Sequence, residues 1–369
     1  MKILFDHQEP FLLAHGGMEI LVGETMQALR DLGVEAETLR WWDNYQKGDI
    51  IHCLGRPSPS HIRFAHNKGI KYVMHELLTA QGSRPLWKIR LQGIMNSILR
   101  KSLPRTLRQA ARWESYQLAN AILASTTWEA KLMRLLYGAP QTRLHVVPTG
   151  VHPAFFEAGL ARENTKNEAG KLKLEFQKSD SQHPKIIIND TSALDPRVST
   201  SRAPLVTVAT ITERKMVVEL AQAAIEAAVP LTVIGKPYSE SDPYYVRFLQ
   251  VVKMSNGQIN YAGSISEPAL LASMLQSARG FVLLSTMETQ STAAIAAAAT
   301  GCPLLLADLP WARCTFGDTA RYVPATSSFR APALRSFYDC ATSLPPPCLP
   351  STWREVAGQL VSVYHGILA

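Results

Sequence analysis

The chain has 369 residues, 46% of them hydrophobic and 18% charged, and its 38 Lys and Arg against 30 Asp and Glu give a formal charge of +8. This length suits two domains with separate cores, and so high an apolar share argues against intrinsic disorder. No apolar run approaches the ~18 residues of a membrane-spanning helix. The five cysteines include no CxxC pair, which indicates neither a disulfide framework nor a zinc site. We expect a soluble two-domain protein of a reducing compartment.

Short apolar runs alternate with helical patterns along the first part of the chain. The runs predict strands at Lys2–Phe5, Glu35–Leu39, Asp49–Cys53, Ile70–Met74, Ala121–Ala124 and Leu144–Val147. Apolar residues at helical spacing predict helices over Met18–Leu32, Leu107–Asn120 and Trp128–Tyr137. This alternation is typical of a parallel sheet with helices on both faces.

A change of composition follows. Residues 157–204 are polar and lack periodicity, and we interpret them as a linker or insertion. A second series then predicts strands at Leu205–Ala209, Leu231–Gly235, Ile259–Tyr261, Phe281–Leu284 and Pro303–Ala307. Its predicted helices are Val217–Ala228, Glu267–Ser277, Thr292–Thr300 and a final one over Ser351–Leu368, with Ser351 as the N-cap. Two such sheets would enclose a cleft at the carboxyl ends of their strands.

The positive charge is concentrated in one segment. Residues 51–113 contain 12 Lys and Arg and a single acid, Glu76, for a net charge of +11. Within the basic segment 84–112, one helical face would carry Leu86, Trp87, Leu91, Ile94, Met95 and Ile98. This pattern suits a helix on an anionic membrane surface, and it suits equally a helix packed on the first domain with solvated cations. Nucleic acid is a weaker interpretation because no recognition motif accompanies the charge.

Several well-known site motifs are missing from the sequence. It has no GxxxxGK[ST] loop, no GxGxxG after the first strand, and no HExxH, GxSxG or D-x-D. These absences argue against P-loop and dinucleotide-binding proteins and against metal catalysis, so we expect no metal site and no cofactor.

One longer stretch carries a resemblance. The run from Phe281 to Glu288, continuing to Gly301-x-Pro303, resembles the donor-site signature of family 4 glycosyltransferases, which are retaining, metal-independent enzymes of the GT-B fold. Ser285 and Glu288 match that signature, whereas Ala296 stands where the family has a second glutamate that holds the nucleotide ribose.

Other segments occur in the order that the resemblance implies. Gly16-Gly17 stands at the glycine-rich loop after the first strand, and Val146–Val151 resembles the exit from the first domain. Val206-x-Val208 and Lys215 resemble the start of the second domain, although the family's arginine position is Thr210. The resemblance covers nearly the whole chain outside the linker.

The resemblance implies a donor site built from five residues. Without a metal, cations and backbone amides must stabilise the leaving diphosphate. Lys215 would supply the charge, and Gly16 and Gly17 would let the backbone approach the phosphates closely. The helix that begins near Ser291 and Thr292 would add free amides and the positive end of its dipole.

Two further residues are implied as catalytic, facing the transferred sugar. Glu288 would hydrogen-bond sugar hydroxyls, and His75, after the fourth strand, would position the sugar or the acceptor. A retaining front-face transfer lets the leaving phosphate take the acceptor's proton, so no dedicated base is required. Each residue also has a structural alternative: a tight turn at Gly16-Gly17, a solvated Lys215, a helix-terminal acid at Glu288 and a buried strand-end histidine at His75.

We therefore predict an α/β protein of the GT-B fold, with two Rossmann-like parallel-sheet domains facing a cleft. Residues 1–156 would form the acceptor-side domain and residues 205–350 the nucleotide-sugar-binding domain. The linker would be residues 157–204, and the helix within 351–369 would cross back to the first domain.

The predicted activity is that of a retaining, metal-independent hexosyltransferase. It would move a sugar from a nucleotide-diphosphate donor to a glycan, a lipid-linked or a small-molecule acceptor, in the cytoplasm or peripherally at the inner face of the membrane. The alternative is a GT-B-like binding or scaffold protein that has lost catalysis, because Ala296 and Thr210 replace two donor-site residues of the family.

Overall fold

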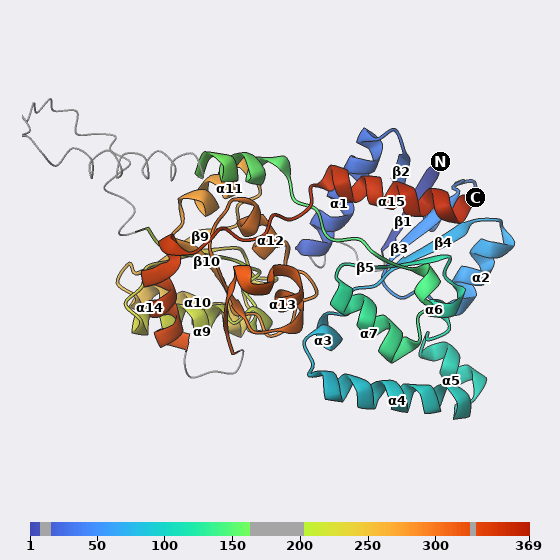
Figure 1. The fold of residues 1–369 in the computed structure, drawn as a ribbon, viewed down its shortest axis with the longest axis horizontal. Helices are drawn as coiled ribbons and strands as arrows, with labels where there is room; N and C mark the ends of the chain where they lie inside the picture. The colour runs from blue at the N-terminus through green and yellow to red at the C-terminus, as the bar shows by residue number, and fades with distance from the viewer. Residues whose placement is uncertain (8–15, 163–202, 325–329) are drawn as a thin grey trace, which may run out of the picture.

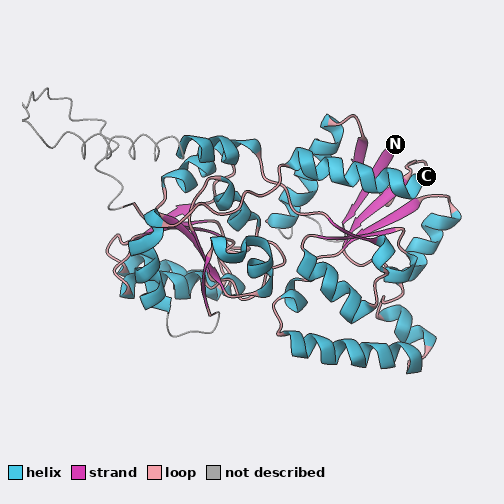
Figure 2. Ribbon diagram, viewed as in Figure 1, coloured by secondary structure: helices cyan, strands magenta, loops and turns pink. Residues whose placement is uncertain are grey.

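The computed structural model describes residues 1–7, 16–162, 203–324 and 330–369. Within the predicted linker, residues 157–162 belong to a helix over residues 153–162, and residues 203 and 204 lead into the next strand. The rest of the linker, residues 163–202, lies outside the described residues. Figures 1 and 2 show two α/β halves side by side, each with a central sheet between helices.

The first half is built on a sheet of six strands, all paired in parallel. In spatial order the strands are β2 (Glu35–Thr38), β1 (Lys2–His7), β3 (Ile50–Leu54), β4 (Lys71–His75), β5 (Ala121–Ala124) and β6 (Leu144–Val146). All residues of β3 and β5 are buried, because helices cover both faces of the sheet, as a parallel sheet requires. The predicted strands of this half are confirmed.

Helices connect these strands. They are α1 (Gly17–Asp31), α2 (Pro59–Asn67), α3 (Thr79–Gly82), α4 (Leu86–Ser102), α5 (Arg105–Ala110), α6 (Ser115–Leu118) and α7 (Thr127–Tyr137). The single helix predicted over Leu107–Asn120 is wrong, since α5 and α6 are separate short helices. Arg112 between them has φ +53°, which no α-helix accommodates. Its guanidinium donates to the carbonyl of Arg56, 2.8 Å away, so a tertiary contact is made where the helix is interrupted.

The second half repeats the plan with another parallel six-stranded sheet. Its spatial order is β12 (Arg321–Val323), β11 (Leu304–Ala307), β10 (Gly280–Leu283), β7 (Leu205–Val208), β8 (Leu231–Ile234) and β9 (Ile259–Gly263). Its helices are α9 (Val217–Glu226), α10 (Pro243–Met254), α11 (Pro268–Ser277), α12 (Thr292–Ala299), α13 (Pro310–Phe316) and α14 (Arg330–Cys340). The predicted α/β class with two Rossmann-like parallel sheets is confirmed.

The last helix, α15 (Trp353–Leu368), follows the second half in sequence but packs on the first. Val356, Leu360 and Tyr364 share a buried cluster with Ile3 and Phe5 of β1. Its N-cap is Thr352 and not Ser351, because the Thr352 hydroxyl accepts from the Glu355 amide and the Glu355 carboxylate accepts in return. The carbonyl of Ser351 instead accepts from the amide of Val151, 2.9 Å away, where the two chain crossings run side by side.

Candidate functional site

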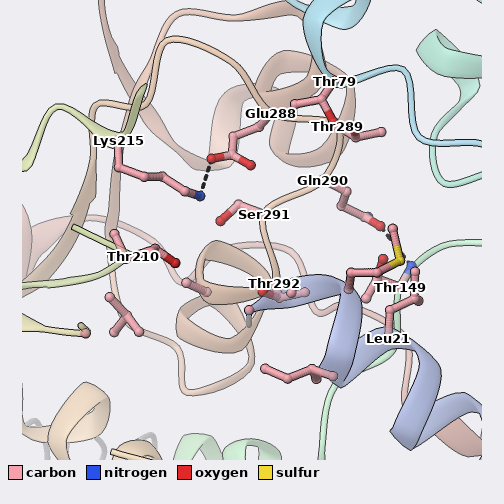
Figure 3. Close-up of a pocket in the computed structure, with 18 of the residues that line it drawn as sticks. Leu21, Thr79, Thr149, Thr210, Lys215, Glu288, Thr289, Gln290, Ser291 and Thr292 are labelled. Carbon is pink, nitrogen blue, oxygen red and sulfur yellow. Dashed lines mark hydrogen bonds and ion pairs between the residues drawn. The ribbon is translucent and has the colours of Figure 1, made fainter. Parts of the chain in front are cut away.

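A cavity of about 440 Å³ lies between the two halves, at the carboxyl ends of their strands. That volume is typical of a small-molecule site. Six of the seven residues predicted for the site line it: Gly16, Gly17, Lys215, Glu288, Ser291 and Thr292. They come from the start of α1, the turn after β7 and the segment that leads from β10 into the start of α12, and Figure 3 shows the labelled side chains around a common space.

The central contact of this cavity is an ion pair between Lys215 and Glu288 (Figure 3). Lys215 ends the 3-10 turn η2 (Glu213–Lys215) and is nearly buried, with 13% of its side chain exposed. Burial lowers the pKa of Lys215, while the carboxylate of Glu288 opposes that shift. Ser285 donates its hydroxyl to Oε1 of Glu288 at 2.7 Å, so the carboxylate is oriented from two sides.

Two cations of the cavity were not predicted from the sequence. Arg214 donates from Nη1 to the carbonyl of Met287 at 2.7 Å and to Oε1 of Glu288 at 3.3 Å. Lys236, after β8, also lines the cavity and is exposed. Thr210, which the resemblance aligns with the family's arginine, lines the cavity too. The available signals were that Arg214 directly precedes Lys215 and that Lys236 follows a strand at the same sheet edge.

Two helix N-termini meet at the cavity. Gly16, with φ +135°, caps α1, and a Cβ placed on Gly17 would lie 3.4 Å from Oγ1 of Thr292 at the start of α12. The Ser291 hydroxyl accepts from the Ala294 amide at 3.3 Å and so caps α12. The first amides of a helix have no intrahelical partner and lie at its positive end. The two termini therefore direct the positive ends of two helices to the cavity, an arrangement that favours an anion.

His75 is the predicted site residue that does not line this cavity. It ends β4 and is 6% exposed, and its Nε2 lies 3.5 Å from Oγ of Ser125, which does line the cavity. Its ring centroid lies 5.7 Å from that of His52, whose Nδ1 is 2.6 Å from the hydroxyl of Tyr364. Burial lowers the pKa of His75 to about 4, so the imidazole is neutral at physiological pH.

Glu129 is a buried residue that holds two loops of the cavity together, and it was not predicted from the sequence. It is 2% exposed, and its carboxylate accepts from the amides of Leu78 at 2.6 Å and Ser125 at 2.7 Å. It thus ties the loop after β4 to the loop after β5, and both loops carry cavity residues. Burial raises the pKa of Glu129 to about 7. The sequence signal was Thr126-x-x-Glu129, the pattern of a capping box.

This buried carboxyl predicts a pH-dependent stability. Because its folded pKa of about 7 exceeds the ordinary 4.5, the folded state retains a proton that the unfolded state loses between those values. Its contribution to the free energy of unfolding therefore falls as pH rises from about 5 to 8, by about 2–3 kcal/mol. Urea unfolding of wild type and Glu129→Gln across this range should show that slope only in the wild type. Glu240→Gln, at an exposed position, serves as the control, and parallel slopes for all three proteins would contradict the prediction.

The segment that carries Glu288 also makes hydrogen bonds to the first half. Thr289 Oγ1 lies 2.8 Å from Thr79 Oγ1, and the side-chain carbonyl of Gln290 accepts from the Thr149 amide at 2.8 Å (Figure 3). These contacts close one wall of the cavity.

Among the described residues, no group of three or more His, Cys, Asp or Glu is arranged to hold a metal ion.

No protein-family model matches the chain, and no curated protein matches it in sequence. The architecture nonetheless defines the fold: two six-stranded parallel sheets that face a shared cavity are arranged as in the GT-B fold.

Individual structures show how complete the likeness is. A glycosyltransferase from Rickettsia africae has a TM-score of 0.62 at 14% identity, with 100% of this chain and 98% of that chain covered. Sucrose-phosphate synthase from Thermosynechococcus elongatus has a TM-score of 0.61 at 14% identity and coverages of 100% and 99%. HepE from Anabaena, solved with UDP, has a TM-score of 0.61 at 12% identity and coverages of 100% and 98%. At these identities the likeness defines the fold.

Proposed function

We propose that the protein is a retaining, metal-independent glycosyltransferase that takes its sugar from a nucleotide-diphosphate donor. The observation that carries this proposal is the joint placement of Lys215, Arg214 and the two helix N-termini around one cavity between the halves. Such an arrangement offers several positive groups to a bound diphosphate without a metal ion. These groups would also stabilise the charge that builds on the leaving phosphate.

Each site residue has a part in this proposal. Lys215 and Arg214 would contact the diphosphate, which would replace Glu288 as their partner. Glu288 would then accept hydrogen bonds from hydroxyls of the donor sugar while Ser285 holds it in place. His75 would act through Ser125 as a positioning residue. Gly16 and Gly17 would bring backbone amides to the phosphates from the first half.

UDP-sugars are the donors that we favour. HepE was solved with UDP, and a pneumococcal O-GlcNAc transferase with a TM-score of 0.52 was solved with UDP and GlcNAc. The acceptor would be a glycan, a lipid-linked molecule or a small molecule that enters from the first half. We place the enzyme in the cytoplasm, with a lipid-linked acceptor drawing it to the inner face of the membrane.

The alternative function is that of a GT-B-like binding or scaffold protein without catalysis. It is favoured by Ala296 of α12, which stands at the position of the family's second glutamate and has no side-chain oxygen to accept a hydrogen bond. The ribose carboxylate of the family therefore has no counterpart at that position. Donor binding and turnover must be measured separately to distinguish the two functions.

Calorimetric titration with UDP-, GDP- and ADP-sugars in the presence of EDTA tests the proposal. We expect micromolar binding of a UDP-sugar that EDTA does not change, followed by hydrolysis or transfer of the sugar. Binding without turnover on any acceptor would support the scaffold function. Absence of binding to every donor would overturn both the donor site and the proposed activity.

A further inference from the structure

Helix α4 lies at the outer edge of the first half and is fixed to α7 by one of its faces (Figure 1). That face carries Ile89, Gly93 and Asn96, which are buried. A Cβ on Gly93 would come within 2.4 Å of the Leu135 carbonyl, so the two helices are in close contact. The Asn96 side chain donates to the carbonyl of Leu136 at 3.1 Å. One apolar residue, Ile89, and two small or polar residues, Gly93 and Asn96, therefore make the contact that holds α4.

The opposite face of α4 is apolar and uncovered. The side chains on it and their exposed fractions are Trp87 64%, Leu91 62%, Ile94 61%, Met95 53% and Ile98 60%. At 3.6 residues per turn they lie about half a turn from the buried face. These five residues, which we call the α4 stripe, do not pack on the first domain, and that interpretation of the sequence is wrong for them. Single exposed apolar residues are ordinary, whereas a contiguous row of five indicates an interaction surface.

Positive charge borders the α4 stripe on both sides. Residues 77–112 contain eight Lys and Arg and no Asp or Glu. Lys88 is exposed on one side of the stripe, and Arg90 and Lys101 are exposed on the other. The Lys88 ammonium lies 5.4 Å from the centre of the Trp87 ring, so a cation and an aromatic ring sit together at the border of the stripe. An apolar centre with cationic margins is complementary to a bilayer that carries anionic headgroups.

We propose that the α4 stripe and its flanking cations dock the protein on an anionic phospholipid surface. The five apolar side chains would enter the boundary between headgroups and acyl chains, and Lys88, Arg90 and Lys101 would contact lipid phosphates. A second copy of this chain fits the surface poorly, because a two-fold contact between α4 helices would bring cations against cations. No described helix is both long and apolar enough to cross a bilayer, so docking would be peripheral. The inference goes beyond the proposed function and needs no step of sugar transfer.

Flotation with vesicles of phosphatidylcholine alone, or with about 30% phosphatidylglycerol, tests this surface. We expect binding to the anionic vesicles that weakens between 0.1 and 0.5 M salt, since the charges are screened. Each surface cation near such a membrane contributes a factor of about five. The variant Lys88→Gln, Arg90→Gln, Lys101→Gln should therefore bind about 100-fold more weakly.

A second variant addresses the apolar side chains, with a matched control in the other half. Leu91→Gln, Ile94→Gln, Ile98→Gln should abolish binding. Val246→Gln, Leu249→Gln, Met254→Gln replaces three exposed apolar residues of α10 and should leave binding unchanged. Circular dichroism and UDP titration without vesicles check that each variant is folded, and they report on the donor site independently of the membrane.

Three results would overturn the inference. The first is equal binding of the wild type to neutral and anionic vesicles, or binding to neither. The second is retention of wild-type vesicle binding by the charge variant, which is conservative enough to fold. The third is a concentration-dependent dimer, seen by light scattering and lost in the α4 stripe variant, which would identify a second copy as the partner.

Discussion

Replacing Lys215 by alanine is expected to raise the dissociation constant for UDP by about 100-fold and to lower kcat/KM at least as far. The ammonium is nearly buried and lies beside the cavity with Arg214 as its cationic neighbour. A charge-assisted contact to a diphosphate in such a partly dry site contributes about 1.5–3 kcal/mol, and the contribution grows as charge develops on the leaving phosphate. Titration with UDP and initial rates with the identified UDP-sugar measure the two quantities.

This substitution also leaves Glu288 without its closest partner, so binding must be separated from stability. The single variant should unfold about 1–3 kcal/mol more easily, because a buried carboxylate loses a charged hydrogen bond. The double variant Lys215→Ala, Glu288→Gln removes that carboxylate charge and should recover most of the stability without recovering UDP binding. Lys253→Ala, an exposed lysine of α10, is the control. Unchanged affinity in Lys215→Ala would remove this residue from the proposed donor site.

The sheets were predictable from the sequence because their signals are local. Runs such as Ile50–Leu54 and Ala121–Ala124 are buried along their whole length, and strands of this kind appear in a sequence as short continuous apolar segments. Helix α10 was not among the predicted helices, although it has comparable signals. Asp242 caps it, Pro243 occupies its first position, and Phe248 and Val251 are buried at helical spacing.

Features set by tertiary contacts were not predictable in the same way. The apolar pattern around Arg112 predicts one continuous helix. The helix is interrupted there, and Arg112 contacts Arg56, which is distant in sequence. In α4 the apolar stripe gave the correct helix, but it did not show which face is buried. The contact with α7 is made by Ile89 together with Gly93 and Asn96, and a hydrophobic pattern does not register the last two.

In the candidate site, too, residues in local motifs were predictable and residues placed by tertiary contacts were not. Gly16, Gly17 and Lys215 stand in recognisable local motifs, and the structure brings them to one cavity. The burial of His75 depends on Ser125 and on His52 from a neighbouring strand, so its separation from the cavity could not be read from its own strand. The contribution of Arg214 depends on the fold of the loop after β7, which turns through Met216 at φ +56°.

Gly235→Ala is expected to have the largest effect on stability, lowering the free energy of unfolding by about 3–5 kcal/mol. Gly235 follows β8 with φ +146°, and a Cβ there would lie 1.9 Å from the carbonyl oxygen of Ala209. Its amide donates to Gly263 at 2.7 Å, and its carbonyl accepts from the Tyr261 hydroxyl at 3.0 Å. The backbone is therefore held from several sides and cannot move away without breaking these hydrogen bonds.

The same substitution should weaken donor binding, because Gly235 and Ala209 both line the cavity and Ala209 leads directly into Thr210. Gly257→Ala is the matched control: its φ of +83° is also left-handed, but no atom lies within 4 Å of the added methyl group. The free energy of unfolding of this control should fall by only about 1 kcal/mol, because backbone strain is the only cost. Urea unfolding separates the steric effect from the strain, and UDP titration of whatever folds measures its effect on the site. Equal stability of the two alanine variants would contradict the prediction. It would mean that the backbone around Gly235 and Ala209 can shift to admit a methyl group at little cost in free energy, so that this wall of the cavity is not rigid.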